Sequence, residues 1–209
     1  MDYREFNRQL DELSNIISDG ITYFSVWHCL TVEDDESAQA LNRYRGLFLP
    51  TKVAMQNMAL MQFAKVFDRH HKAISLRNLL LAAKGNREQL TPHITEEDLQ
   101  NIENGIDTSD NLLSRLKCYR DQRLAHHDSF ITKDSPIFYG EMQTLMKDTV
   151  SMYNALRVGH KRGVVTYEHL VTEVERHTSK VVQLVREDRE RAIQKLKDIE
   201  KEESISDLA

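Results

Sequence analysis

Residues 53–67 read Val-Ala-Met-Gln-Asn-Met-Ala-Leu-Met-Gln-Phe-Ala-Lys-Val-Phe, and this stretch decides the fold. Its apolar side chains are so dense that they surround the helix on all sides, which is typical of a helix at the centre of a bundle. We interpret the methionines as core filler and not as part of a cofactor site, because methionine packs into irregular gaps. This helix is expected to extend over residues 37–68, with a break or kink near Phe48–Leu49, since Pro50 lacks a backbone donor.

Apolar periodicity and helix caps predict further helices on both sides of this segment. Gly20 weakens the first of them, because glycine is a poor helix former. Asn104-Gly105 is expected to end one short helix, and Ser135-Pro136 to begin a long one, with serine as the N-cap. The expected helices cover residues 3–31, 75–84, 95–103, 109–119, 136–159 and 166 onward.

No segment alternates in the manner of a strand, so we expect an all-α, up-and-down bundle of four to five long helices with short helices inserted between them. Residues 1–185 form the predicted single domain. Residues 186–209 are rich in charge and carry only a thin apolar seam of Ala192, Leu196 and Ile199. We interpret this part as a charged helical extension; a helix that docks on a partner is the alternative.

Composition limits the function classes. The 209-residue chain carries a net charge of −5, which argues against a surface that coats nucleic acid indiscriminately. Its polar N-terminus has no signal-peptide pattern, and the longest apolar run, residues 21–32, is too short and too polar to span a membrane. Two distant cysteines, Cys29 and Cys118, fit free thiols in a reducing compartment. We therefore expect a cytoplasmic protein with no membrane association.

The candidate chemistry lies in residues 119–128, Tyr-Arg-Asp-Gln-Arg-Leu-Ala-His-His-Asp. A guanidinium, Arg120, pairs well with phosphate oxygens, and an imidazole such as His126 transfers protons near neutral pH. Together they are a minimal metal-free set of groups for cleaving an RNA phosphodiester. The helix that carries Arg120 is expected to end or kink near this motif, because positions six apart on a regular helix lie about 120° apart.

Ordinary interpretations of this motif compete with the catalytic one. Arginine and aspartate at a helix surface are usually solvated, and one of two adjacent histidines often packs against a core. The adjacent pairs His70-His71 and His126-His127 also raise the question of a metal. Neighbours on a helix point about 100° apart, so neither pair chelates alone, and we expect no metal site.

The motif Arg120-Asp-Gln-Arg-Leu-Ala-His-His-Asp128 resembles the signature of HEPN domains, an arginine with a polar neighbour followed four to six residues later by a histidine. Its ending is similar to that of the abortive-infection (AbiU-type) branch. The upstream stretches 64–69, Ala-Lys-Val-Phe-Asp-Arg, and 74–80, Ile-Ser-Leu-Arg-Asn-Leu-Leu, resemble the same branch. The resemblance covers roughly residues 20–130 together with the helical remainder.

This resemblance implies an all-α HEPN-like domain that dimerises with two motifs facing each other across the interface. It implies catalytic roles for Arg120, Asp121 and His126; His127 is the alternative base, because it lies seven residues from Arg120 and so on nearly the same helix face. The expected supporting residues are Tyr119, Arg123, His127 and Asp128, and the expected RNA-binding patch is Arg115 and Lys117.

The resemblance therefore predicts a metal-independent endoribonuclease, with no cofactor, that leaves 2′,3′-cyclic phosphate and 5′-hydroxyl ends. Several such proteins are toxins or antiviral-defence effectors, so a cognate antitoxin is a possible partner besides the RNA substrate and a second copy of the chain. DNA should be inert because it lacks the 2′-hydroxyl. Two alternatives stay open: a catalytically inactive HEPN-like bundle that binds a nucleotide or a protein, and a purely structural helical dimer.

Overall fold

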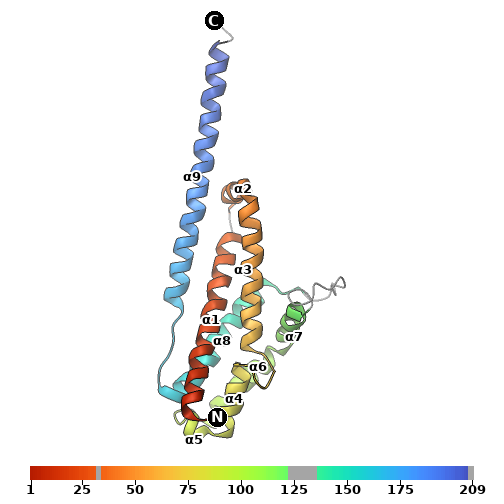
Figure 1. The fold of residues 1–209 in the computed structure, drawn as a ribbon, viewed down its shortest axis with the longest axis vertical. Coiled ribbons are helices and arrows are strands. Elements are labelled where there is room, and N and C mark those ends of the chain that lie inside the picture. The colour runs from red at the N-terminus through yellow and green to blue at the C-terminus, as the bar shows by residue number, and fades with distance from the viewer. Residues whose placement is uncertain (32–33, 122–135, 207–209) are drawn as a thin grey trace. The chain divides into compact units, whose positions relative to one another are not determined.

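The computed structural model describes residues 1–31, 34–121 and 136–206. Regular structure in these ranges is helical, without a strand, which confirms the predicted all-α class (Figure 1). No helix among them combines the length and the apolar content needed to cross a membrane. The four long helices are α1 (Tyr3–Thr31), α3 (Arg45–Val66), α8 (Tyr139–Lys161) and α9 (Glu168–Ser206), and the shorter ones are α2 (Asp35–Arg43), α4 (Leu76–Gly85), α5 (Arg87–Leu90), α6 (Glu96–Thr108) and α7 (Asp110–Tyr119).

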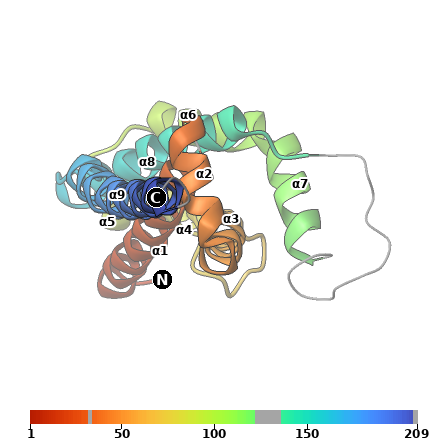
Figure 2. The ribbon, with the colours of Figure 1, turned by 90° about the horizontal axis from the view of Figure 1, so that it is seen from above.

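The chain forms two compact units, and the first comprises residues 1–23 and 57–168. In this unit α6 packs against both α4 and α8, and α7 follows α6 directly (Figure 2). The side chains at its centre are fully buried, among them Phe6, Phe63 and Tyr153. Gly20 has a structural purpose here, because a Cβ at this position would lie 3.2 Å from Cε2 of Phe63. The glycine that weakens the helical pattern thus lets α1 and α3 approach closely.

The second unit comprises residues 24–56 and 169–209. Leu30, Leu41, Phe48 and Val182 form its apolar cluster. The Tyr44 hydroxyl donates a hydrogen bond to Asp188 at 2.6 Å and attaches α9 to the end of α2. Helix α9 continues without a break through residue 185 to Ser206, so the charged segment is a direct extension of it. Whether this extension is a solvated tail or docks on a partner stays a prediction.

The predicted starts of the helices at residues 75 and 95 are confirmed by their caps. Helix α4 begins after Ser75, whose hydroxyl accepts from the backbone N–H of Asn78 at 3.3 Å. Helix α6 begins with a reciprocal capping box, in which Thr95 accepts from the N–H of Asp98 while the Asp98 carboxylate accepts from the N–H of Thr95. Local hydrogen bonds of this kind satisfy the first donors of a helix and can be identified from sequence.

The break in the second helical stretch lies earlier than predicted. The chain turns at Tyr44, between α2 and α3, and Pro50 lies inside α3. Pro50 is the sixth residue of α3, so it removes only one hydrogen bond, the one to the carbonyl of Gly46. Gly46 has open space around its Cα, which leaves the backbone room to adapt to the proline ring.

Two other predicted boundaries are wrong. Helix α6 continues through Asn104-Gly105 to Thr108, and a Cβ at Gly105 would lie 3.1 Å from Sδ of Met152, so this glycine serves helix packing and not termination. Helix α8 begins at Tyr139 and not at Pro136. Its first free donor, the N–H of Phe138, is capped by the Glu141 carboxylate at 2.9 Å. Ser135 lies outside the described residues.

Stability is expected to fall when the buried ring of His160 must take up a proton. Its Nδ1–H donates to the carbonyl of Leu90 at 2.5 Å, and its ring lies 4.2 Å from that of Tyr3. Burial lowers the pKa of His160, so in acid the unfolded chain binds the proton first. The contribution of neutral His160 to the free energy of unfolding is therefore complete above the ordinary histidine pKa of about 6.5. Below that pH the contribution is lost, by at most about 1.4 kcal/mol per pH unit.

Urea unfolding of the wild type and of His160→Gln, from about pH 7.5 down to about pH 5, measures this effect. The glutamine variant should lose the pH-dependent part, because an amide does not titrate in this range. His93→Gln, at an exposed histidine, is the matched control and should behave as the wild type does. Identical pH profiles for the wild type and His160→Gln would contradict the assignment.

Candidate functional site

The predicted motif begins where α7 ends. Leu113 and Leu116 bury one face of this helix, and the Tyr119 hydroxyl donates to Oδ1 of Asn57 on α3 at 2.9 Å. Arg120 and Asp121 directly follow Tyr119 and adopt a π-helical turn. Regular α-helical geometry is therefore interrupted at the first two residues of the motif, and π turns often occur at functional sites. The predicted end or kink of this helix near the motif stays a prediction, because the residues after Asp121 lie outside the described ranges.

Arg120 is held between two carboxylates. Its Nε donates to Oδ1 of Asp121 at 2.7 Å, and its Nη1 donates to Oδ2 of Asp68 at 3.0 Å. Asp68 lies in the loop between α3 and α4, where its other oxygen accepts from the backbone N–H of His70 at 2.8 Å. The guanidinium is about three quarters buried, so its direction is fixed by these contacts and not by solvent.

These contacts also fix the charges. The hydrogen bond that Arg120 donates to Asp121, together with the one it donates to Asp68, raises the pKa of Arg120 against the effect of partial burial. Partial burial would raise the pKa of Asp68, but the N–H of His70 and the guanidinium of Arg120 outweigh burial and lower this pKa. At neutral pH the arginine is a cation and Asp68 an anion, so the site presents a permanently charged, oriented guanidinium.

The two residues of the predicted RNA-binding patch have different surroundings. Arg115 donates to the carbonyl of Pro136 at 2.6 Å and forms an ion pair with Glu141 of α8, so it connects α7 to α8. Lys117 is exposed and forms no ion pair with any residue in the described ranges. Of the two, only Arg115 is paired with a carboxylate among the described residues.

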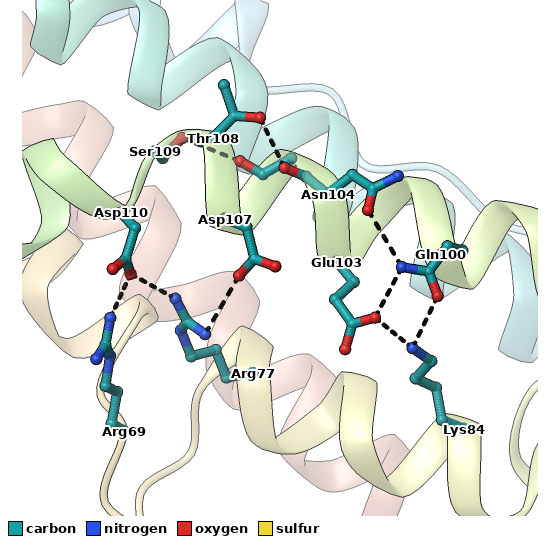
Figure 3. Close-up of polar contacts among 11 residues, drawn as sticks. Arg69, Arg77, Lys84, Gln100, Glu103, Asn104, Asp107, Thr108, Ser109 and Asp110 are labelled. Atoms are coloured by element: carbon teal, nitrogen blue, oxygen red, sulfur yellow. Dashed lines mark hydrogen bonds and ion pairs between the residues drawn. The ribbon is translucent and has the colours of Figure 1, made fainter.

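A second ion-pair network fixes the other end of α7 (Figure 3). The Asp110 carboxylate accepts from Arg69 and, at 3.0 Å, from Arg77, while Arg77 also lies 3.9 Å from Asp107. Consecutive loop residues, Asp68 and Arg69, thus bind the two ends of the same helix.

A cavity of about 740 Å³ opens between this loop and α7. Its apolar lining comes from Ala64, Phe67 and Leu113. Its polar lining combines four basic side chains with one carboxylate and one hydroxyl: Arg69, His70, Lys117, Arg120, Asp68 and Ser114. The cavity therefore has a cationic wall over an apolar floor, a combination suited to an organic phosphate.

Part of the predicted site cannot be placed. Arg123, His126, His127 and Asp128 lie outside the described residues, so the convergence of Arg120 with an imidazole stays a prediction. Among the residues that the structure does describe, no three His, Cys, Asp or Glu side chains gather in a way that could hold a metal ion.

Sequence reasoning missed the loop residues Asp68, Arg69 and His70 as members of the site. A signal was present, because the Phe67-Asp68-Arg69 segment belongs to the upstream stretch that resembles the AbiU-type branch. Apolar periodicity does not predict where a loop lies in space, and this loop comes close to Arg120 only in the folded chain.

Asp68→Asn should lower the RNA cleavage that the motif predicts about tenfold, with little loss of stability. Asparagine keeps the size of the side chain and an oxygen for the N–H of His70, but it removes the charge that orients Arg120. Small misplacements of a catalytic group cost one to two orders of magnitude in rate, whereas such a partly exposed ion pair contributes about 1 kcal/mol or less.

The measurement is a comparison of RNA cleavage rates and melting temperatures for Asp68→Asn and for Asp148→Asn, at an exposed aspartate on α8. The control should match the wild type in both. An unchanged cleavage rate in Asp68→Asn would remove Asp68 from the site.

Comparison with known proteins adds one match. The family model described as AbiU2, of the HEPN class, matches residues 3–181. The matched range contains both ends of the cavity described above, the loop after α3 and the end of α7. Neither a curated protein nor a solved structure matches the chain.

Proposed function

We propose that this chain, which belongs to the AbiU2 family of HEPN proteins, is a metal-independent endoribonuclease. The observation that carries the proposal is the geometry of Arg120. Its guanidinium is oriented by Asp68 and Asp121 on the wall of a cationic cavity, where a phosphodiester would meet it. Guanidinium groups pair with two phosphate oxygens at once and stabilise the charge that develops during phosphoryl transfer.

The proposed reaction is a transesterification within the RNA. The imidazole of His126 takes the proton of the ribose 2′-hydroxyl, and the 2′-oxygen attacks the adjacent phosphorus. As the P–O5′ bond breaks, Arg120 stabilises the charge on the non-bridging oxygens. The products are a 2′,3′-cyclic phosphate and a 5′-oxygen, which leaves as a hydroxyl after protonation.

Protonation of the leaving 5′-oxygen needs an acid, and one imidazole cannot serve as base and acid in the same step. A homodimer with two motifs across a two-fold axis would supply both groups in a composite site. Light scattering that finds only monomer at micromolar concentration would contradict this arrangement.

The biological role that fits this activity is that of a toxin or an antiviral-defence effector, restrained by a cognate antitoxin. Indiscriminate cleavage of cellular RNA stops growth, so expression of the chain alone should arrest a host cell. Normal growth at high expression of active protein would contradict a toxic role.

The test of the reaction class is an incubation of total RNA with the purified protein in the presence of EDTA. The expected fragments carry 2′,3′-cyclic phosphate and 5′-hydroxyl ends, and a DNA oligonucleotide of the same sequence stays intact, because it lacks the nucleophile. Complete inhibition by EDTA, or fragments with 5′-phosphate ends, would contradict the proposal.

A second candidate is a catalytically inactive HEPN-like bundle that binds a nucleotide or a protein. One observation favours it: two carboxylates already neutralise Arg120, and a phosphate must compete with them. Binding of RNA without any cleavage, by protein of native stability, would favour this alternative.

The order of importance of the two adjacent histidines is a further prediction. The family pattern places the base directly after alanine, at His126, whereas a regular helix would favour His127. Because the helix departs from regular geometry at Arg120, the family pattern decides, and His126→Ala should lower the cleavage rate more than His127→Ala. The reverse ranking would move the base to His127 and leave the reaction class intact.

A further inference from the structure

The cavity beside Arg120 has more cationic wall than one phosphate at Arg120 requires. Arg69 and Lys117 lie on it together with Arg120, and Asp68 is the only carboxylate among the described residues that line it. A scissile phosphate held by Arg120 leaves the other two cations without a role in the reaction. Their positive charges could bind a second anionic group of the same ligand.

The polar residues that α7 and its end contribute to the cavity follow one another at regular spacing. Ser114, Lys117 and Arg120 are spaced by three residues, so each is a neighbour of the next along α7 and its end, and all three line the cavity. A polymer that reaches Arg120 along this row therefore meets Lys117 next. Lys117 is exposed and forms no ion pair with any residue that the structure describes.

Arg69 faces the row from the opposite wall. One terminal nitrogen of Arg69 donates to Oδ1 of Asp110, and Arg77 donates to the same oxygen (Figure 3). A guanidinium has five N–H donors, so this pairing orients Arg69 without using up its capacity. Arg69 and Lys117 thus both line the cavity, and the contact with Asp110 orients Arg69 there.

The floor of the cavity is apolar. Phe67 and Leu113 line it, and both are largely buried, so the floor belongs to the rigid core of the first unit. A free phosphate ion would not use such a floor, whereas a nucleoside would lay its sugar and base on it. The volume of about 740 Å³ accommodates one nucleotide.

We propose that this cavity is a binding subsite for the nucleotide next to the cleaved bond, with its phosphate on Lys117 and Arg69 and its nucleoside over Phe67 and Leu113. This proposal rests on the proposed function in one respect, because that function identifies the bound polymer as RNA. It makes Lys117 and Arg69 substrate-positioning residues that act on binding, separate from the reacting groups.

The test is the binding of a short 2′-O-methyl RNA oligonucleotide, which has no nucleophile and cannot be cleaved. The dissociation constant is measured over a range of salt concentrations for the wild type, for Lys117→Ala and for Lys147→Ala. Lys147 is the matched control, because it is exposed on α8, outside the cavity. Loss of one phosphate contact should reduce the slope of log affinity against log salt by about 0.7 in Lys117→Ala and leave it unchanged in Lys147→Ala.

A second variant tests the apolar part of the subsite. Ser114→Tyr places a bulky side chain at the exposed edge of the cavity without a change of charge. It should weaken binding about tenfold, keep the salt slope of the wild type and leave the melting temperature unchanged. Wild-type affinity in this variant would overturn the proposal that a nucleotide enters the cavity.

Failure of the subsite and failure of the proposed function give different results. Equal slopes for Lys117→Ala and Lys147→Ala, with normal cleavage by the wild type, would overturn the subsite and leave the ribonuclease intact. Binding with the predicted slopes, but no cleavage of ordinary RNA, would support the subsite and reject the ribonuclease. Absence of any binding to the oligonucleotide would overturn the subsite.

Discussion

Arg120→Ala should reduce RNA cleavage by a factor of about 10² to 10³, the usual effect of removing one group that stabilises a developing oxyanion. The side chain is about three quarters buried and has its direction fixed by Asp68 and Asp121. No solvent cation can take the same place with the same orientation. The loss should therefore appear in the rate of cleavage at saturating RNA more than in affinity.

Arg120→Lys sharpens this prediction. A lysine keeps the charge but has only three donors on one nitrogen and no planar fork, so it cannot hold both carboxylates and also pair side by side with two phosphate oxygens. It should restore little of the lost activity. Full recovery with lysine would mean that only the charge matters and that the fixed geometry of Arg120 has no function.

The control for both variants is Arg4→Ala, at an exposed arginine on α1 that is remote in sequence from the motif. Melting temperatures should stay close to that of the wild type in all three variants, because a pair of this exposure contributes about 1 kcal/mol or less. Loss of cleavage in Arg120→Ala with an unchanged melting temperature separates catalysis from folding. Wild-type cleavage in Arg120→Ala would contradict the catalytic role.

The helices could be predicted where the information is local. Ser75 and Thr95 begin helices through hydrogen bonds within three residues, and such contacts depend on sequence alone. The helix break predicted at Pro50 and the helix end predicted at Gly105 are wrong for one shared reason, because proline and glycine both have low helix propensity. Tertiary packing overrides propensity at both, because Pro50 loses only one bond near the start of α3 and Gly105 makes room for Met152.

The sequence predicts only part of the candidate site. Arg120 was identifiable because its motif is continuous in sequence, whereas Asp68 lies 52 residues away and meets it only in the folded chain. The same applies to the pairing of Arg69 with Asp110, which are 41 residues apart. Contacts of this range depend on how α3, α4 and α7 pack, and no local pattern encodes them.

Gly159→Val should produce the largest loss of stability, about 3 kcal/mol. A Cβ at residue 159 would lie 2.7 Å from Cβ of Ile94 and 2.9 Å from its Cγ2. Ile94 is buried, and the Gly159 carbonyl accepts from the backbone N–H of His93 at 3.0 Å, so the segment before α6 lies directly on α8. Because the nearest atom is attached to the backbone, the conflict requires a shift of that segment, and overpacking of this kind typically costs 1–3 kcal/mol.

Thermal unfolding measures the effect, and the melting temperature should fall by roughly 6–12 °C in a chain of this size. The matched control is Gly140→Val on the same helix, where a Cβ would meet no atom within 4 Å. Since valine and glycine are both modest helix formers, this control should stay within about 0.5 kcal/mol of the wild type. Equal melting temperatures for the two variants would mean that the contact between Ile94 and Gly159 is not part of the native packing, and α8 would then need a different position against the segment before α6.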